Sequence, residues 1–143
     1  MADNILELAE RRTSDAREWI QSATFPRQVR SAPLARHFVT EAIGRHPAGD
    51  DALLLASELI TNVLVHASDA TVVTVIVTVA AALICVDVYD DGRTGIPHWR
   101  DAGSRAEDGR GFQIVNALAG RWGFTREQDR TCCWFEVTAA SAA

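Results

Sequence analysis

Three polar side chains recur along one helical stretch and are the first candidates for chemistry. Residues 51–67 have the hydrophobic spacing of an amphipathic helix, and Glu58, Asn62 and His66 follow one another at intervals of four residues. The neighbours of this column are unusually apolar: Leu54, Leu55 and Val65. A carboxylate and an amide one turn apart suit a metal-bound phosphate with a nearby general base. The column is equally consistent with an ordinary solvent-exposed stripe.

Two further polar residues are expected at one end of an apolar sheet face. Side-chain alternation in the predicted strand 83–90 puts Asp90 on its apolar face, and alternation in 131–138 does the same for Thr131. Polar groups that converge on an apolar face are typical of a small-molecule pocket, in which Asp90 would accept a hydrogen bond from a ligand amine. Because Asp91-Gly92 follows, Asp90 is equally consistent with a turn carboxylate that caps its own backbone, and Thr131 with an ordinary strand threonine.

A glycine-spaced loop leads into the last expected helix. Gly109, Arg110 and Gly111 stand at its start, where glycine permits close backbone approach to a ligand and a helix N-terminus attracts anions. The segment lacks the full dinucleotide fingerprint and follows a loop rather than a strand, which excludes a Rossmann site.

The elements that must position these residues are predicted from hydrophobic period and from turn residues. Helices are expected at 4–20, 31–44, 52–67 and 111–119, and strands or extended segments at 22–29, 71–79, 83–90, 121–126 and 131–138. Asp50 or Asp51 is expected to cap the third helix. The core stripe expected on that helix consists of Leu53, Ala56, Ile60, Val63 and Ala67. Residues 91–109 form a long polar loop, typical of a lid or a binding loop.

This order of elements predicts an α/β arrangement in the form of an α+β two-layer sandwich. A mixed, mostly antiparallel sheet would be covered by helices on one face. Residues 1–21 are expected to be an N-terminal helical extension, 22–138 a single domain and 139–143 a frayed tail.

The composition excludes several classes of protein. The chain has 143 residues and a net charge of −5, and all 14 basic residues are arginine. The absence of lysine excludes a P-loop lysine, the strand lysine of protein kinases and a pyridoxal Schiff base. An acidic chain with scattered arginines makes nucleic acid an unfavourable partner, and no apolar run is long enough for a membrane span. The three cysteines match neither a disulfide framework nor a metal spacing, so we expect a cytoplasmic protein.

Taken in order, these motifs resemble the ATP-binding domain shared by histidine kinases, gyrase, the heat-shock chaperone ATPase and mismatch-repair ATPases. The resemblance is strongest to the small, single-domain bacterial branch of anti-sigma-factor serine kinases, and it covers about residues 25–138. Residues 57–67 resemble the N box of that branch, Asp90-Asp-Gly92 its first glycine box, and 109–115 its second. Arg121-Trp-Gly123 and 131–135 resemble its closing strands.

The resemblance implies the Bergerat ATP-binding fold and a role for each matching residue. Asn62 would coordinate Mg²⁺ on the triphosphate, and Glu58 would be the general base for a serine hydroxyl of a partner. Asp90 would accept the adenine amino group, Gly92 belongs to the first glycine box, and Thr131 would support the adenine contact. The remaining nucleotide-binding residues would approach the phosphates: Gly109, Arg110 and Gly111.

The implied partner is a sigma factor or an anti-sigma-factor antagonist protein, with ATP and Mg²⁺ as cofactors. The sequence leaves open whether the chain forms a homodimer. It departs from the family pattern at Arg93-Thr94 after Gly92, and at Asp129-Arg130, where relatives often have Gly-Lys. Two alternatives therefore stay open: a nucleotide-sensing protein-binding module without catalysis, and a domain that has lost ATP binding.

Overall fold

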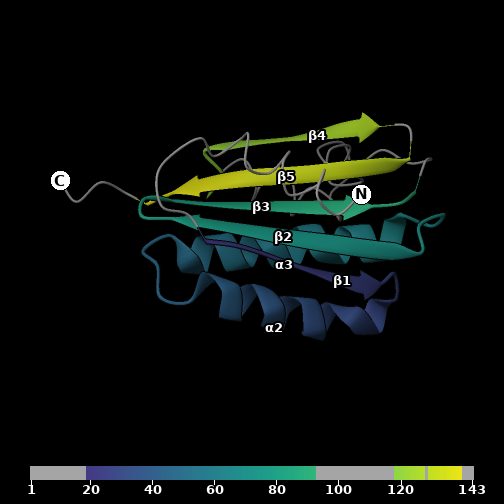
Figure 1. Cartoon of the computed structure of the whole chain (residues 1–143), viewed down its shortest axis with the longest axis horizontal. Helices are drawn as coiled ribbons and strands as arrows, with labels where there is room; N and C mark the ends of the chain where they lie inside the picture. The colour runs from purple at the N-terminus through teal and green to yellow at the C-terminus, as the bar shows by residue number, and fades with distance from the viewer. Residues whose placement is uncertain (1–18, 93–117, 128, 140–143) are drawn as a thin grey trace, which may run out of the picture.

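The runs of β-branched residues form one five-stranded sheet. The structure is a computed structural model, and it describes residues 19–92, 118–127 and 129–139. The strands are β1 (Trp19–Pro26), β2 (Val72–Ala80), β3 (Leu83–Asp90), β4 (Arg121–Glu127) and β5 (Arg130–Thr138), in the order β1-β2-β3-β5-β4 (Figure 1). Each neighbouring pair of described strands is antiparallel, so the parallel component of the expected mixed sheet is not found among them.

A short 3-10 turn and two helices connect β1 to β2. The turn η1 (Val29–Ser31) leads into α2 (Ala32–Ile43), and α3 (Gly49–His66) follows after a short connection. Pro33 lies in the first turn of α2, where its missing N–H costs no helical hydrogen bond. Gly44 ends α2 with a φ of 60°, in the left-handed region that favours glycine. The helix expected over 31–44 is confirmed.

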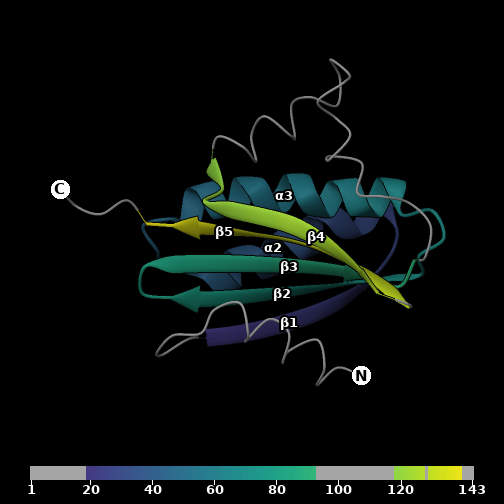
Figure 2. The ribbon, with the colours of Figure 1, turned by 90° about the horizontal axis from the view of Figure 1, so that it is seen from above.

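Both helices lie on one face of the sheet, which confirms the two-layer sandwich (Figure 2). Within it, α2 packs on β1 and β2, whereas α3 packs on β3 and β5. Aliphatic side chains of α3 meet the apolar residues of the strands in one core cluster; its fully buried members include Leu55, Leu59, Val75, Val86 and Phe135. This packing places α3 over the two strands that carry Asp90 and Thr131.

Two predicted element boundaries are wrong. Trp19 and Ile20, expected at the end of helix 4–20, begin β1 because they pair with β2. The remainder of that helix prediction lies outside the described residues. Asp50 and Asp51, expected as caps, lie inside the first turn of α3, and its N-cap is Ala48 without a side-chain hydrogen bond.

The buried side of α3 is wider than the predicted stripe. Its buried residues are Ala52, Leu55, Ala56, Leu59, Ile60, Val63 and Leu64. Leu53 and Ala67, expected in the core, are half-buried, and Leu55, expected beside the polar column, is fully buried. The reason is that α3 packs against α2 as well as the sheet, so two neighbours bury a broader face than one would.

Most of the expected loop 91–109 and helix 111–119 lies outside the described residues, as do residues 1–18 and 140–143. The domain boundaries proposed from the sequence therefore stay predictions. In the parts of the chain that are described, no helix is long and apolar enough to cross a membrane.

Arg27 ties the end of β1 to the C-terminal end of α3. Its Nε donates to the carbonyl of Ala70 at 2.8 Å, and its Nη1 donates to the carbonyl of Leu64 at 3.2 Å. The last carbonyls of a helix have no partner within the helix, and they attract positive charge. Arg27 thus fixes the end of α3 beside the start of β2.

Replacing Arg27 with alanine is expected to lower the free energy of unfolding by about 1–3 kcal/mol, because two carbonyls lose a charged donor. Arg27→Lys keeps the charge but offers a single donor group, so we expect an intermediate loss. Urea denaturation measures both changes. The matched control is Arg30→Ala, because Arg30 is exposed and bonds only Gln28 among the described residues. An equal loss in Arg30→Ala and Arg27→Ala would contradict the role given to Arg27.

Candidate functional site

Asp90 and Thr131 are direct cross-strand partners at one end of the sheet. Asp90 pairs with Val73 of β2 on one side and with Thr131 of β5 on the other, and Thr131 pairs with Arg126 of β4. All four side chains belong to the sheet face that the helices cover, because the alternate residues of these strands join the core beneath α2 and α3. The predicted convergence of Asp90 and Thr131 is confirmed.

The Asp90 carboxylate is buried but keeps one oxygen uncommitted. Its side chain is 8% exposed, and Oδ1 accepts the backbone N–H of Gly92 at 2.8 Å. No hydrogen bond from the described residues reaches Oδ2. The turn interpretation of Asp90 is confirmed through Oδ1, and a hydrogen bond from a ligand to Oδ2 stays a prediction.

Burial is the main reason that the pKa of Asp90 is raised from 3.8 to about 6. The nearby carboxylates of Asp69 and Asp91 raise it further. The N–H of Gly92 and the positive charge of Arg126 act in the opposite direction. Shifts of this kind, caused by burial together with nearby charges, are enriched at functional sites.

Gly92 is required at this point because there is no space for a side chain. A Cβ there would lie 2.6 Å from Oδ1 of Asp69 and 2.8 Å from Oδ1 of Asp90. The Thr131 hydroxyl donates to the carbonyl of Gly92 at 3.4 Å, which links β5 to the same turn. The backbone of Gly92 thus lies close to the carboxylates of Asp69 and Asp90 and to the hydroxyl of Thr131. A side chain at residue 92 would collide with both carboxylates.

The adjacent carboxylate, Asp91, has a structural role. It accepts the backbone N–H groups of Thr71 at 2.7 Å and Val72 at 3.1 Å, and it also accepts the Thr71 hydroxyl. Although burial alone would raise the pKa of Asp91, these hydrogen bonds outweigh it and hold that pKa below the ordinary 3.8. Asp91 therefore fastens the start of β2, whereas Asp90 lies on the sheet face that the helices cover.

The polar column of α3 consists of Glu58, Asn62 and His66. The C-terminal end of α3 lies at the same end of the sheet as Asp90. Glu58 and Asn62 are half-buried and His66 is exposed. Because α3 ends at His66 and the chain then enters β2 beside Asp90, Asn62 lies one turn nearer to Asp90 than Glu58 does. Neither Glu58 nor Asn62 hydrogen-bonds through its side chain to another described residue. Gly109, Arg110 and Gly111 lie outside the described residues.

Arg126 and Asp69 are the two residues near Asp90 that the sequence analysis did not select. Arg126 could have been found from side-chain alternation, because Trp122 and Phe124 on the same strand belong to the core face. Asp69 lies in the α3–β2 connection, and no sequence pattern indicates its approach to Gly92.

Arg130, the position where relatives often have lysine, does not face Asp90. Its guanidinium lies over the Tyr89 ring at 5.5 Å, and Nε and Nη2 bind one carboxylate oxygen of Glu127 at 2.9 and 2.8 Å. Tyr89 belongs to the opposite face of the sheet from Asp90. The departure from the family pattern at Arg130 therefore lies on the sheet face opposite Asp90.

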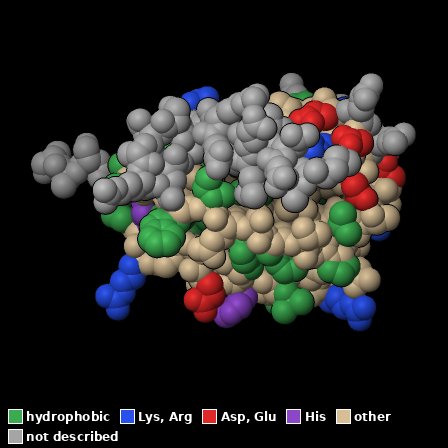
Figure 3. All heavy atoms as spheres, in the orientation of Figure 1, with side chains coloured by type: hydrophobic (Ala, Val, Ile, Leu, Met, Phe, Trp, Pro, Cys, Tyr) green, Lys and Arg blue, Asp and Glu red, His purple; other side chains and the backbone are tan. Residues whose placement is uncertain are grey.

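The end of the sheet around Asp90 is acidic. Figure 3 shows acidic side chains gathered where β3 ends and β4 turns into β5; Asp91, Glu127 and Asp129 lie there. A polyphosphate would be repelled from such a surface unless a cation accompanied it. No group of three His, Cys, Asp or Glu side chains able to hold a metal occurs among the described residues. Half-buried Asn62 on α3 offers an amide oxygen, and Mg²⁺ commonly takes one or two protein oxygen ligands together with the phosphates of its substrate.

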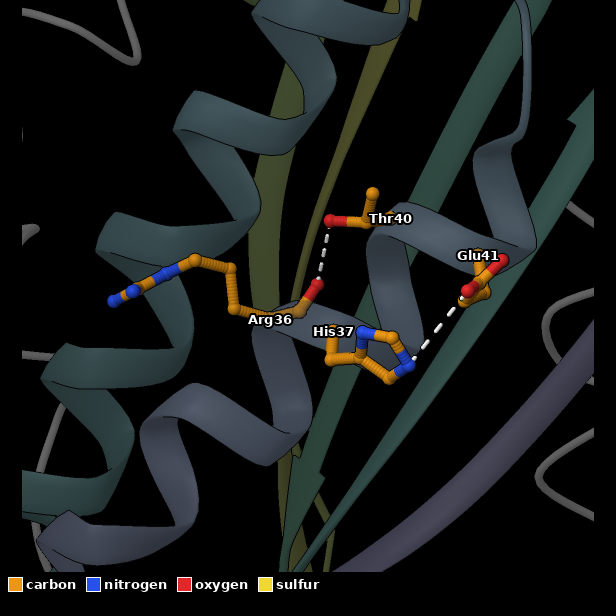
Figure 4. Close-up of polar contacts among 4 residues, drawn as sticks. All are labelled: Arg36, His37, Thr40 and Glu41. Carbon is orange, nitrogen blue, oxygen red and sulfur yellow. Dashed lines mark hydrogen bonds and ion pairs between the residues drawn. The ribbon is translucent and has the colours of Figure 1, made fainter.

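The described histidines do not gather near Asp90. Figure 4 shows the ring of His37 directed towards Glu41, and Nε2 lies 3.6 Å from Oε1 on the exposed side of α2. Nδ1 of His46 accepts the backbone N–H of Ala48 at 3.0 Å, so its Nε2 donates to the carbonyl of Ala80 at 2.7 Å. A hollow of about 350 Å³ adjoins His46. It lies at the end of the sheet opposite Asp90, so it is separate from the candidate site.

Comparison with known proteins identifies the family. The model of the histidine kinase-like ATPase domain matches residues 25–137. The chain belongs to the histidine kinase-like ATPase family. The match includes both helices, β2, β3, β4, nearly all of β5 and the five described candidate residues, and it takes in only the last two residues of β1. Membership supports an ATP-binding regulatory function and confirms the family resemblance of the motifs. No curated protein sequence matches the chain.

Solved structures show the same fold. The histidine kinase domain of a blue-light activated histidine kinase from Erythrobacter litoralis aligns with a TM-score of 0.51 and 22% identity. That alignment covers 81% of this chain and 62% of the kinase domain, so the chain spans less than two thirds of it. The Acinetobacter baumannii histidine kinase AdeS aligns with a TM-score of 0.50 and 12% identity over 98% of this chain and 77% of that one.

The raised pKa of Asp90 gives a prediction for stability against pH. Ionisation of Asp90 is harder in the folded protein than in the unfolded chain, so its effect becomes destabilising as pH rises from about 4 to about 6. In Asp90→Asn this effect is absent. The stability of Asp90→Asn relative to wild type should therefore increase by on the order of 2 kcal/mol between about pH 4 and pH 7. Urea denaturation at each pH measures this difference.

Asp91→Asn is the matched control with the opposite sign. Because the pKa of Asp91 is lowered by folding, its carboxylate contributes stability above the unfolded pKa of 3.8 that is lost in acid. This variant should lose stability relative to wild type as pH rises from acid to neutral. A pH-independent difference in Asp90→Asn would show that Asp90 does not titrate as described.

Proposed function

We propose that this histidine kinase-like ATPase domain binds Mg-ATP and transfers the γ-phosphoryl group to a serine of a protein partner. The observation that carries the proposal is the pair Glu58 and Asn62 on α3, half-buried, one turn apart and without hydrogen bonds to the described residues. A half-buried carboxylate and amide are stable without protein partners only where solvent or a ligand satisfies them. Asn62 lies nearer than Glu58 to the end of the sheet that carries Asp90, and Asp90 would bind the opposite end of the nucleotide.

The adenine base would be recognised at the end of the sheet. Oδ2 of Asp90 would accept a hydrogen bond from the exocyclic amine, and Thr131 would hold the Gly92 turn and contribute its hydroxyl to that contact. Val88 and Cys133, the next residues on the same face of these strands, are fully buried in the core beneath the helices, so Asp90 and Thr131 lie at the margin of an apolar region. Such a small number of placed polar groups in apolar surroundings is the usual composition of a cofactor site.

The phosphates would lie along α3. Asn62 would hold Mg²⁺ through its amide oxygen, and the loop residues Gly109, Arg110 and Gly111 would approach the phosphates. When bound, Mg²⁺ would neutralise charge on the phosphate oxygens. This arrangement requires no lysine, in agreement with its absence from the sequence.

Glu58 would act as the general base. Its carboxylate would accept the proton of the partner's serine hydroxyl while the serine oxygen attacks the γ-phosphorus and the bond from phosphorus to the ADP oxygen breaks. The position of Glu58, one turn from Asn62, suits a group that acts beside the γ-phosphate rather than on the base. The partner proposed from the resemblance of residues 57–67 is a sigma factor or an antagonist of an anti-sigma factor, and the setting proposed is the cytoplasm.

A nucleotide-sensing module without catalysis is the second candidate. It is favoured by one observation, namely that no described residue orients the Glu58 carboxylate. A general base is usually positioned by a neighbour. In this alternative, ATP binding alone would change the affinity for the partner.

Replacing Glu58 with glutamine separates the two candidates. Phosphorylation of the cognate serine protein should fall by about 100-fold or more, because the acceptor of the hydroxyl proton is lost. ATP affinity should stay within about threefold of wild type, because Glu58 touches neither the base nor the metal in this arrangement. Transfer of radiolabelled phosphate and a binding titration measure the two quantities.

The matched control is Glu41→Gln, which removes an exposed carboxylate from α2 at a distance from the site. It should leave both quantities unchanged. Unchanged phosphorylation in Glu58→Gln would refute the base assignment. ATP-dependent partner binding without phosphoryl transfer in wild type would favour the sensing module.

A further inference from the structure

The sheet face opposite the helices is buried although no described helix or strand lies on it. Both described helices cover the other face (Figure 2). Nevertheless, five residues in the middle of the opposite face are 0–2% exposed in a single chain: Ile76, Cys85, Asp87, Tyr89 and Cys132. Ile20 and Trp134 pack against the apolar members of this group. These five residues are therefore shielded from solvent within one chain, and the two described helices do not provide the shield.

Two buried polar atoms indicate what the cover must supply. Oγ1 of Thr78 and Oε2 of Glu136 are buried and have no hydrogen-bond partner among the described residues, and both residues are cross-strand neighbours of Cys85. Arg121 is 3.5 Å from the other carboxylate oxygen of Glu136. A buried carboxylate oxygen without a donor is strongly unfavourable. The covering segment should therefore combine apolar side chains with at least one strong donor.

We propose that the N-terminal segment, residues 1–18, packs across this face of the sheet. The described chain starts at Trp19 on the edge strand β1, and the next residue, Ile20, already contacts the buried group. Residues 1–18 thus enter at the margin of the face. As a helix they would span about 27 Å, against about 19 Å between the outer strands of a five-stranded sheet.

The composition of the segment matches the requirement. It carries aliphatic residues and three arginine donors; these are Ile5, Leu6, Leu8, Arg11, Arg12 and Arg17. The other long segment, 93–117, leaves the sheet after Gly92, which lies beside Asp90 of the helix-covered face. Its starting point favours the nucleotide side, so the N-terminal segment is the better candidate for the opposite side.

The native cysteines provide the test, because they lie on both faces. Cys85 and Cys132 belong to the face in question, whereas Cys133 points into the core beneath the helices. In the full chain, Leu8→Asp should raise the rate of iodoacetamide labelling at Cys85 and Cys132 by roughly tenfold or more. The rate at Cys133 should not change. Mass spectrometry of the labelled peptides resolves each thiol.

Leu34→Asp is the matched control, because Leu34 is 63% exposed on α2 and should leave all three rates unchanged. No rise at Cys85 and Cys132 in Leu8→Asp would overturn the proposal. If dilution of the wild-type protein increases the labelling rate of Cys132, a second copy of the chain covers this face, and the proposal is overturned. If the labelling rates of all three thiols rise together, the Leu8→Asp variant has unfolded. The milder double variant Ile5→Ala/Leu8→Ala then replaces it, and the proposal again requires faster labelling of Cys85 and Cys132 with no change at Cys133.

Discussion

A carboxylate at the end of an apolar strand face is the constraint on which the site depends. Asp90 is 8% exposed, and such burial is unfavourable to a charge unless donors are aimed at it. The Gly92 N–H meets one oxygen, and only glycine fits between Asp90 and Asp69. The second oxygen accepts no hydrogen bond from the described residues. The pKa of Asp90 is raised because the hydrogen bond from Gly92 only partly offsets the effect of burial.

The neighbouring Asp91 shows how position along a turn decides the role of a side chain. Asp90 ends β3 on the covered face, and Asp91 turns outward to bind the backbone of Thr71 and Val72. The α3 helix is fixed from the same region, because Arg27 binds carbonyls at its end and in the connection to β2. Its polar column is therefore held at a defined position relative to Asp90.

Much of this site follows from local sequence patterns. The bounds of the strand 83–90 were predicted as observed, and alternation alone placed Asp90 and Thr131 on one face because a strand has a period of two residues. The predictions that were wrong depend on tertiary contacts. Trp19 and Ile20 have helical spacing but pair with β2, and Leu55 is buried where α3 packs between the sheet and α2. Alternation in β4 could have placed Arg126 on the face of Asp90, but its position opposite Thr131 comes from the strand register, which no local pattern contains.

Adenine recognition by Asp90 is the central claim, and calorimetric titration with ATP and GTP in Mg²⁺ tests it most directly. ATP presents an amine where GTP presents a carbonyl oxygen, and Oδ2 of Asp90 can accept only from the amine. We expect ATP to bind roughly tenfold or more tightly than GTP, and the difference to shrink in Asp90→Asn, whose amide can donate to the carbonyl of GTP. Absence of ATP binding, or equal affinity for ATP and GTP in wild type, would contradict the account.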